Sequence, residues 1–380
     1  MGNRKNYNVA VVGATGLVGR TFLELAEKSD FPFGELRLFA SPQSEGKTLR
    51  FRGEDLPVRT ADRESFRNAD FVFFFAGREV SAKYVPVAAE NGAIAIDNSS
   101  RFRMEREVPL IVPEINFSDY RGTERRIANP NCSTIQAVLP LAAIARKFGL
   151  KSVSYVTFQA VSGSGQGGIN DLSRTRAGEP PSFYPYAIEK TCIPQIGDFD
   201  AEGNSEEERK MRDETRKILH LPDLPVSATC VRVPVENAHA VCVSAETELS
   251  CSAEEARKAI AAQKGCVIVD DPDRSLYPVS SLASGRNEVF VGRIRRDEAR
   301  KNGILFYCVA DNLRRGAAYN ALLIAEKIVE RTSGKSDQKK YVNNINKTVD
   351  KLIMAWYNMC VVRTKETKEK LWANRYTAYF

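Results

Sequence analysis

The chain has 380 residues, of which 43% are hydrophobic and 27% are charged, and its formal net charge is +7. This length and balance predict a globular protein with two domains, each large enough to bury a substantial core. The basic residues are spread along the chain and form no stripe with interleaved aromatics, so no nucleic-acid partner is expected. A small polyanionic substrate or cofactor fits the charge.

Cysteine usage and hydropathy limit the compartment and the kind of site. The chain has 8 cysteines, none in a Cys-x-x-Cys pair, and 2 histidines, so no metal site is expected. Its polar start lacks the pattern of a signal peptide, and no apolar run reaches the roughly 18 residues of a membrane span. These features predict a cytoplasmic protein with free thiols and no membrane partner.

The first third of the chain alternates strand and helix patterns. Residues 7–12 predict a buried strand and residues 18–28 a helix, and further strands are predicted at 35–40, 71–75 and 93–96. Such alternation is typical of a parallel sheet with helices on both faces. The predicted fold class here is α/β.

The pattern changes after a predicted helix at 133–148. The strands that follow are longer and more strictly alternating, which predicts an antiparallel or mixed sheet with one open face. These strands are expected at 153–159, 229–235, 239–249, 266–270, 288–295 and 304–310. Two helices between them begin with capping boxes, Ser205 with Glu208 and Ser252 with Glu255.

After a last predicted helix at 317–331 the composition changes. Residues 333–337 have the composition of a linker, and the remainder is rich in Lys, Asn, Thr and Tyr. A terminal helix, a partner-binding tail and foreign sequence are all open, and an appendage with no part in catalysis is favoured. The predicted division is a cofactor domain at 1–133 plus 311–332, a catalytic and dimerisation domain at 134–310, and a tail at 333–380.

Three glycines follow the first predicted strand and open the first helix. Gly13, Gly16 and Gly19 give the spacing G-x-x-G-x-x-G. Glycine at such a turn lets backbone N–H groups approach a pyrophosphate and lets the helix pack closely on the strand. The motif predicts a Rossmann-type dinucleotide site, and the alternative is a tight turn without a ligand.

The end of the second predicted strand bears on the choice of nucleotide. Many NAD sites place Asp or Glu there to bind the ribose hydroxyls. This chain has no carboxylate immediately after the strand, whereas Ser41, Ser44 and Lys47 could bind a 2′-phosphate. The sequence therefore favours NADP.

Cys132 lies at the start of the helix predicted at 133–148, in Asn-Pro-Asn-Cys-Ser-Thr. Unpaired N–H groups at a helix N-terminus favour a thiolate, so Cys132 is a candidate nucleophile, although a small buried hydrophobe is the alternative. His220 follows a polar helix and is expected to cap its end. His239 is thus the candidate acid/base partner, unless it is purely structural.

A series of ordered motifs extends from about residue 7 to 331. They occupy 13–19, 97–100, 102–104, 112–116, 129–134, 159–165, 210–211, 214–218, 230–239 and 312–318. On these motifs the chain resembles the aspartate-β-semialdehyde dehydrogenase family.

The resemblance implies roles at matching positions. Cys132 resembles the nucleophile, His239 the acid/base, and Gln159 the residue that orients the acyl intermediate. Arg232 resembles the arginine that binds the substrate carboxylate, and Glu207, flanked by further glutamates, the group that binds its amino group. The implied phosphate-binding residues are Arg103, Asn131 and Lys210. The cofactor-binding residues are Gly13, Thr15, Gly16, Leu17, Val18, Gly19, Ser41, Ser44, Ser162, Gly163 and Asn312.

The implied reaction is the reversible, NADPH-dependent reduction of L-aspartyl 4-phosphate to L-aspartate 4-semialdehyde through a cysteine thioester. It would serve the biosynthesis of lysine, methionine and threonine. The implied architecture is a Rossmann-type domain plus an α+β catalytic and dimerisation domain with a mixed sheet. The implied assembly is a homodimer or homotetramer.

Two positions depart from the family pattern, and two other functions remain open. Gln43 stands where many relatives have arginine near the 2′-phosphate, and Ser164 replaces a commoner alanine. An N-acetyl-glutamyl-phosphate reductase has similar domains but typically carries Pro-Gly-Cys at the nucleophile, where this chain has Pro-Asn-Cys. A non-catalytic NADP-binding sensor would not require Cys132, His239 and Arg232 together.

Overall fold

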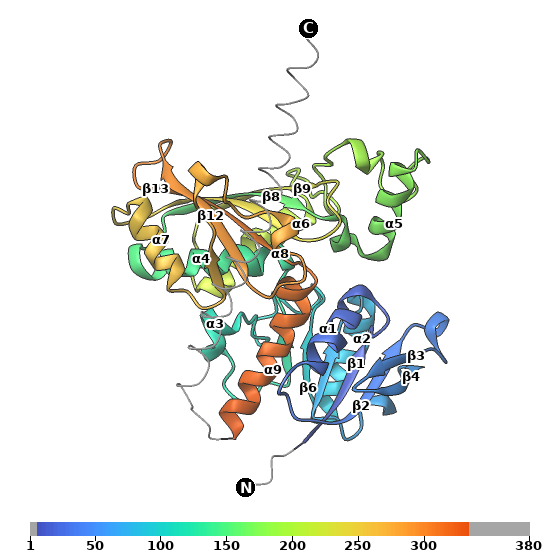
Figure 1. Cartoon of the computed structure of the whole chain (residues 1–380). Coiled ribbons are helices and arrows are strands. Elements are labelled where there is room, and N and C mark those ends of the chain that lie inside the picture. The colour runs from blue at the N-terminus through green and yellow to red at the C-terminus, as the bar shows by residue number, and fades with distance from the viewer. Residues whose placement is uncertain (1–5, 334–380) are drawn as a thin grey trace. The chain divides into compact units, whose positions relative to one another are not determined.

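Two mixed sheets organise the part of the chain that the structure describes (Figure 1). The computed structural model describes residues 6–333, so the predicted tail lies outside the described residues except for its first residue. The strand order is β3-β4-β2-β1-β5-β6-β7 in the first sheet and β11-β12-β13-β10-β8-β9 in the second. The predicted fold class, a doubly wound α/β part followed by a mixed sheet, is confirmed.

The strand order of the first sheet reverses at β1, with β2 on one side of it and β5 on the other. Its strands are β1 (Tyr7–Val12), β2 (Phe33–Ala40), β3 (Thr48–Phe51), β4 (Glu54–Thr60), β5 (Phe71–Phe74), β6 (Ile94–Asp97) and β7 (Arg126–Ala128). All pair in parallel except β3 with β4. Because β1 lies between β2 and β5, the carboxyl ends of β1 and β5 form the switch point at which open α/β sheets bind ligands.

At two positions of the glycine turn after β1 there is no space for a side chain. Gly13 has a φ of +86°, and a Cβ there would lie 2.6 Å from the carbonyl oxygen of Phe75, just after β5. A Cβ on Gly19, in helix α1 (Leu17–Glu27), would lie 2.2 Å from the carbonyl oxygen of Gly13. The helix therefore packs directly on the turn, as the motif predicts.

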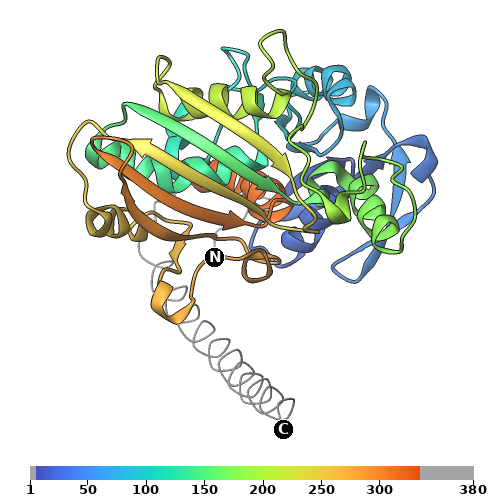
Figure 2. The same ribbon diagram turned by 90° about the horizontal axis from the view of Figure 1, so that it is seen from above.

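The second sheet carries its long helices on one face, and the short helix α8 (Ser280–Ala283) covers only part of the other, at Phe290 and Val309. Its strands are β8 (Ser152–Gln159), β9 (Val226–Arg232), β10 (His239–Glu246), β11 (Cys266–Ile268), β12 (Val289–Asp297) and β13 (Gly303–Ala310). Helices α4, α6 and α7 pack against it from one side, and Figure 2 looks onto the strands from the other. On that open face Val156 and Phe158 of β8 are 40% and 38% exposed.

Eight α-helices follow α1 in residues 6–333. They are α2 (Arg78–Glu90), α3 (Pro113–Asn116), α4 (Cys132–Phe148), α5 (Gly165–Arg176), α6 (Glu206–Leu219), α7 (Ala253–Ala261), α8 (Ser280–Ala283) and α9 (Tyr319–Thr332). Of these, α4, α6, α7 and α9 lie at predicted positions. Both predicted capping boxes are present, at Ser205 and Ser252. His220 ends α6 in the left-handed conformation, as expected for a cap. No helix between residues 6 and 333 has the length and apolar character needed to cross a bilayer.

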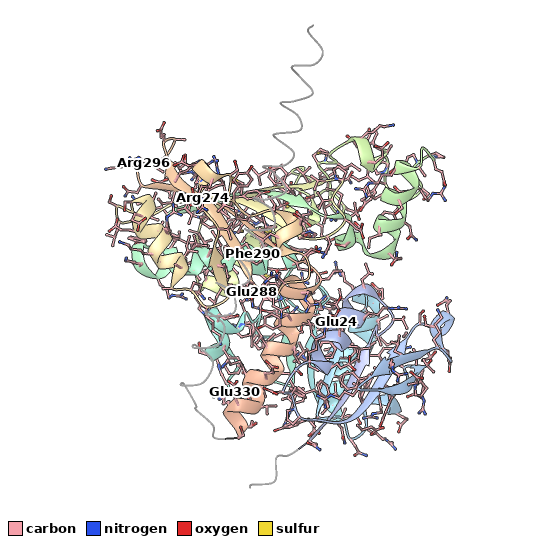
Figure 3. The ribbon with its side chains drawn as sticks, in the orientation of Figure 1. Glu24, Arg274, Glu288, Phe290, Arg296 and Glu330 are labelled. Atoms are coloured by element: carbon pink, nitrogen blue, oxygen red, sulfur yellow. The ribbon has the colours of Figure 1, made fainter. Side chains whose placement is uncertain are left out.

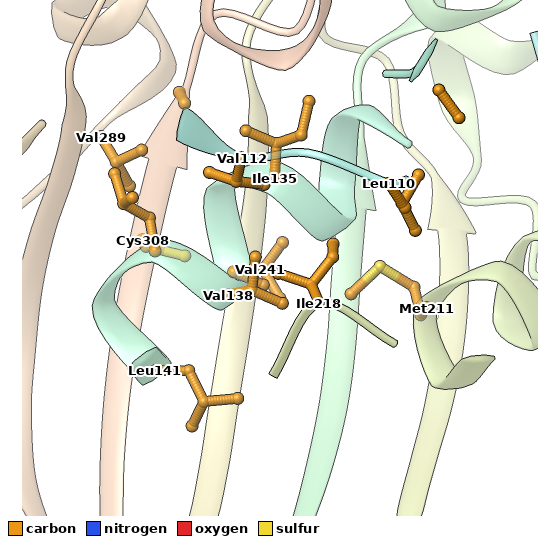
Figure 4. Close-up of a cluster of buried hydrophobic side chains, with 14 of the residues drawn as sticks. Leu110, Val112, Ile135, Val138, Leu141, Met211, Ile218, Val241, Val289 and Cys308 are labelled. Atoms are coloured by element: carbon orange, nitrogen blue, oxygen red, sulfur yellow. The ribbon is translucent and has the colours of Figure 1, made fainter. Parts of the chain in front are cut away.

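Helix α4 is the central element of the core. Every residue from Ser133 to Ile144 is buried, which is the pattern of a helix enclosed on all sides. Figure 4 shows Val138 beside Val241 of the second sheet, with Met211 and Ile218 of α6 nearby. Each buried aliphatic side chain contributes about 1.5–3 kcal/mol. This packing fixes α4 along its length, and with it the position of Cys132 at its first turn.

The last described segment returns to the first sheet. Arg314 begins a π-helical turn (Arg314–Ala318) and donates from Nη1 to Glu24 of α1, labelled in Figure 3, at 3.2 Å. Asn320 of α9 donates to the side chain of Asn129, just after β7, at 2.7 Å. The domain boundaries predicted at 133/134 and 310/311 stay a prediction.

Three predicted segments differ from the observed ones. The strand predicted at 229–235 ends at Arg232, because Pro234 lacks the N–H that would continue it. The strand predicted at 239–249 ends at Glu246. The helix predicted to begin at residue 317 begins at Tyr319, directly after the π-helical turn. The short elements β3, β7, α3 and α8 have too few residues for a periodic signal. Strand β4 is mostly polar and contains Pro57, and α2 and α5 were also missed.

The close approach of α1 to the glycine turn gives a stability prediction. Gly19→Ala places a methyl group against the carbonyl of Gly13, so we expect it to lower the free energy of unfolding by about 2 kcal/mol. Gly77→Ala is the matched control, because a Cβ there meets no atom within 4 Å. Urea denaturation measures both, and equal stabilities would contradict the packing argument.

Candidate functional site

Cys132 is the first residue of α4, and Asn131 caps the helix. The Asn131 Oδ1 accepts hydrogen bonds from the backbone N–H groups of Ser133 and Thr134, at 2.9 and 3.2 Å. A Cβ on Gly316, in the π-helical turn, would lie 2.7 Å from the Cβ of Cys132. The cap fixes the start of the helix, and the glycine allows the π-helical turn to approach the cysteine closely.

A pocket of about 840 Å³ opens at Cys132. Its walls come from the switch point of the first sheet, the start of α4, the loop after β8, helix α6 and the segment before α9. Eleven of the predicted site residues line it: Val18, Arg103, Asn131, Cys132, Gln159, Ser162, Gly163, Glu207, Lys210, Arg232 and Asn312. The structure thus brings together residues that span most of the described chain.

Gln159 and Arg232 reach the pocket side by side. They are the last residues of β8 and β9, two parallel strands whose register pairs them directly. Paired residues of adjacent strands lie on the same face of a sheet. Arg232 is buried and donates from Nη1 to the carbonyl oxygen of Ala160 at 2.7 Å. This contact orients its guanidinium group at the pocket wall.

His239, the first residue of β10, is fully buried beside the pocket. Its Nδ1 accepts a hydrogen bond from the backbone N–H of Ala160 at 2.9 Å, so the proton of the neutral ring is on Nε2. That Nε2 has no hydrogen-bond partner within residues 6–333, and a Cβ on Gly163 would lie 3.0 Å from it. Burial, with Arg232 adding to it, lowers the pKa of His239 well below its ordinary value. The side chain is a neutral Nε2–H donor.

Helix α6 contributes a carboxylate and an ammonium group. Glu207 is buried and accepts hydrogen bonds from Asn131 Nδ2 at 2.8 Å and from Lys210 Nζ at 3.4 Å. Burial alone would raise the pKa of Glu207, but Lys210, Asn131 and Arg232 outweigh it and lower the pKa. Lys210 also pairs with Glu206 at 3.1 Å. Of the three adjacent glutamates, Glu207 is therefore the one placed at the nucleophile.

Arg103 lines the pocket and makes three hydrogen bonds that hold its side chain in place. Its guanidinium donates to the carbonyl oxygens of Asn129 and Asn98, at 2.9 and 2.8 Å, and to Glu214 at 2.9 Å. The second carboxylate oxygen of Glu214 accepts from the backbone N–H of Asn131 at 2.7 Å. No role was predicted for Glu214.

A signal for Glu214 was present in the sequence. Glu207, Lys210, Glu214 and Lys217 are spaced three, four and three residues apart, so they share one face of α6. Buried Met211 and Ile218 lie among them. Charged side chains at the same helical spacing as core residues indicate that the charges face inward.

The predicted cofactor residues fall into two groups. Ser162, Gly163, Val18 and Asn312 line the pocket, and Asn312 Nδ2 donates to Ser162 Oγ at 2.9 Å. The others lie along the glycine turn and the end of β2, outside the pocket lining. These are Gly13, Thr15, Gly16, Leu17, Gly19, Ser41 and Ser44.

The two parts of the turn region contact each other. Thr15 Oγ1 donates to the Oγ of the buried Ser44 at 3.3 Å, while Ser41 and Lys47 are exposed. Close approach at Gly13 and Gly19 leaves the backbone of the turn bare, which fits a pyrophosphate. The residues present therefore fit a dinucleotide.

The ionisation expected of Cys132 is wrong for the free protein. The sequence predicts a thiolate at the helix N-terminus, but burial raises the pKa of Cys132 to about 11, and Glu207 adds to the rise. Arg232, Arg103 and the N–H of Ser133 act in the opposite direction and are outweighed. The loss of water around the sulfur exceeds the stabilisation by the helix end.

Comparisons with known proteins agree with this arrangement. Residues 8–123 match the family model "Semialdehyde dehydrogenase, NAD binding domain", and residues 141–315 match "Semialdehyde dehydrogenase, dimerisation domain". The aspartate-semialdehyde dehydrogenase of Aquifex aeolicus is 46% identical over 334 residues, which cover 85% of this chain and 98% of that protein. The chain belongs to the aspartate-semialdehyde dehydrogenase family. Its members act in amino-acid biosynthesis as oxidoreductases.

Solved structures of the family share the fold. The Vibrio cholerae aspartate semialdehyde dehydrogenase II complexed with ASA has a TM-score of 0.82 and 40% identity, covering 86% of this chain and 99% of that one. The aspartate semialdehyde dehydrogenase with NADP from Candida albicans has a TM-score of 0.70 and 25% identity, covering 87% and 99%. Membership of this family confirms the predicted resemblance.

The charge of Glu207 gives a prediction about the nucleophile. Because Glu207 raises the pKa of Cys132, Glu207→Gln is expected to lower that pKa and speed alkylation of Cys132 by iodoacetamide at pH 8 by roughly threefold or more. In the unsubstituted protein the rate is expected to keep rising from pH 7 to 10, since the thiolate fraction grows as the pH approaches the pKa.

Mass spectrometry of the peptide that contains Cys132 measures the rate separately from the exposed Cys192. Glu206→Gln is the matched control, because Glu206 contacts the same Lys210 but is not among the charges that act on Cys132. A rate that levels off below pH 8, or no difference between Glu207→Gln and the control, would contradict the assignment.

Proposed function

We propose that this protein catalyses the reversible, NADPH-dependent reduction of L-aspartyl 4-phosphate to L-aspartate 4-semialdehyde and phosphate. One observation carries the proposal: a single pocket holds a cysteine, a buried arginine, a buried carboxylate and a second set of cations. This set complements a molecule with a carboxylate, an ammonium group and an acyl phosphate. Arginine suits planar carboxylate recognition.

Substrate binding orients the reacting carbon. Arg232 binds the α-carboxylate and Glu207 the ammonium group, while Lys210, Arg103 and Asn131 bind the phosphate. The substrate ammonium compensates the charge of Glu207, which is one of the groups that raise the pKa of Cys132. The substrate carboxylate and phosphate in turn lie on Arg232 and Arg103, which lower that pKa, so the charges of the bound substrate act on the thiol in both directions.

The cysteine then carries the acyl group. Cys132 releases its proton to solvent, and the thiolate attacks the acyl carbon. A C–S bond forms and the C–O bond to phosphate breaks, so that phosphate leaves and a thioester remains. When bound, NADPH supplies the hydride that reduces this thioester. The C–S bond of the resulting thiohemiacetal breaks, which releases the aldehyde and returns the thiolate. Gln159 orients the acyl group during these steps.

His239 acts at the acyl oxygen. Its Nδ1 is engaged by the Ala160 N–H, so it acts through the proton on Nε2. That N–H donates to the oxygen that becomes negative when the thiolate attacks and again when the thioester is reduced. We infer that hydrogen-bond donation from Nε2 is the form that the predicted acid/base role takes.

The choice of NADP rests on the end of β2. Ser44 lies against Thr15 of the glycine turn, and Ser41 and Lys47 are exposed beside it, where a 2′-phosphate would be solvated and paired. The structure of the Candida albicans relative is one with NADP. Gln43 supplies a hydrogen-bonding group but no charge at this position.

The proposed assembly is a homodimer formed through the second sheet. The match to a dimerisation domain covers residues 141–315, which include all six strands of that sheet. Its open face exposes Val156 and Phe158, and apolar side chains on an uncovered sheet favour burial against a partner. A homotetramer stays a prediction, as do a cytoplasmic location and service to lysine, methionine and threonine biosynthesis.

A direct assay tests the proposed reaction. Purified protein with aspartate semialdehyde, phosphate and NADP is expected to form reduced cofactor, followed by absorbance, with a lower KM for NADP than for NAD. Cys132→Ala is expected to reduce the rate to background because no thioester can form.

Cys192→Ala is the matched control, since Cys192 is exposed and outside the pocket. N-acetyl-glutamate semialdehyde serves as the alternative substrate. Absence of turnover with aspartate semialdehyde, or turnover that survives Cys132→Ala, would overturn the assignment or the mechanism respectively.

Two substitutions distinguish a donor role for His239 from a base role. His239→Ala removes the Nε2–H donor and is expected to lower kcat about 100-fold, the usual cost of losing one such donor. His239→Gln keeps an N–H at a similar reach and is expected to retain at least about tenfold more activity than His239→Ala. Steady-state kinetics measures both, and equally inactive variants would favour a general base instead.

A further inference from the structure

We propose that Glu214 is a positioning residue that holds the phosphate-binding arginine and the nucleophile segment in one geometry. The inference rests on the proposed function for the role of Arg103, but its structural part stands on contacts alone. Glu214 lies on α6, is 1% exposed and does not line the pocket, so it acts only through its partners.

Both carboxylate oxygens of Glu214 are engaged by donors. Arg103 Nη1 donates to Oε1 at 2.9 Å, and the backbone N–H of Asn131 donates to Oε2 at 2.7 Å. Two donors on two oxygens match an ionised carboxylate, which only accepts hydrogen bonds. Burial raises the pKa of Glu214, and Arg103, the Asn131 N–H and Lys210 oppose that rise without cancelling it.

Glu214 and Arg103 hold the two ends of a short chain segment. Arg103 Nε donates to the carbonyl oxygen of Asn129 at 2.9 Å, two residues before the amide that Glu214 accepts from. Glu214 and Arg103 together therefore clamp residues 129–131, and the next residue is Cys132. A shift of the clamp would move the phosphate-binding guanidinium and the sulfur relative to each other.

The same helix also holds the main chain of Arg103. Lys217, three residues after Glu214, donates from Nζ to the carbonyl oxygens of Arg103, Glu105 and Val108, at 2.7, 2.8 and 2.9 Å. Glu214 thus fixes the side chain of Arg103 while Lys217 fixes its backbone. Catalysis by preorganised charged groups requires such a fixed position of the side chain and the backbone.

Glu214→Gln tests the clamp with little change in size. A glutamine presents one oxygen and one NH₂ group, so either Arg103 or the Asn131 N–H meets a donor instead of an acceptor. We expect the KM for inorganic phosphate in the aldehyde-oxidising direction to rise about tenfold, the scale of one lost hydrogen bond to a charged group. The KM for NADP is expected to stay within about twofold, which a general loss of structure would not produce.

Hydrogen exchange gives a second readout that needs no turnover. Glu214→Gln is expected to speed exchange of the Asn131 amide, seen by mass spectrometry in the peptide that spans 129–134. Glu208→Gln is the matched control, because Glu208 lies on the same helix and accepts from the backbone N–H of Cys230 at 3.0 Å. It is expected to speed exchange at Cys230 and to leave the KM for phosphate unchanged.

The outcomes separate the two proposals. An active parent protein whose KM for phosphate and Asn131 exchange are both unchanged in Glu214→Gln overturns the role of Glu214. Inactivity of the parent protein overturns the proposed function, while exchange at Asn131 still tests the clamp. Should Glu214→Gln fail to fold, Glu214→Asp keeps the charge and shortens the reach, and the same two measurements apply.

Discussion

The position of Asn131 is the constraint on which the rest of the site depends. Its side chain caps α4 through Ser133 and Thr134 and donates to Glu207, while its backbone N–H donates to Glu214. A single residue thereby ends the loop from the first sheet, begins the central helix and joins both to α6. Cys132 is the next residue, so the hydrogen bonds made by Asn131 determine where Cys132 lies.

The peptide of Ala160 has a comparable role on the opposite wall. Its N–H donates to His239 and its carbonyl oxygen accepts from Arg232. The two side chains come from different strands, and the loop after β8 sets both of them. The tautomer of His239 and the direction of the Arg232 side chain therefore both depend on one backbone position. A displacement of this loop would affect hydrogen-bond donation by His239 and carboxylate binding by Arg232 together.

Buried charges in this site are stable because they are arranged as hydrogen-bonded sets. An isolated buried charge costs several kcal/mol, and here Arg103 is balanced by Glu214, and Lys210 by Glu206 and Glu207. Glu207 and the loss of water keep Cys132 in its thiol form in the free protein. The site is electrostatically balanced before the substrate arrives, and the substrate's own charges change that balance.

The sequence by itself determined the local features of this protein. Glycine spacing identified the turn after β1, alternation and capping boxes located most long elements, and the residues around Cys132 and His239 identified the pocket, because each depends on neighbours within a few positions. Short elements such as β7 and α3 have too few residues to show a hydrophobic periodicity. The register of Glu207 among three glutamates was open until its contact with Asn131 was seen.

Only the tertiary structure decided how these pieces act on one another. The thiol state of Cys132 depends on burial and on Glu207, which lies 75 residues further along the chain. The tautomer of His239 depends on the amide of Ala160 in the loop after β8. Glu214 shares a helical face with Glu207 and Lys210, but its partners Arg103 and Asn131 belong to distant segments. Desolvation and long-range hydrogen bonding are properties of the folded arrangement, so no local pattern in the sequence contains them.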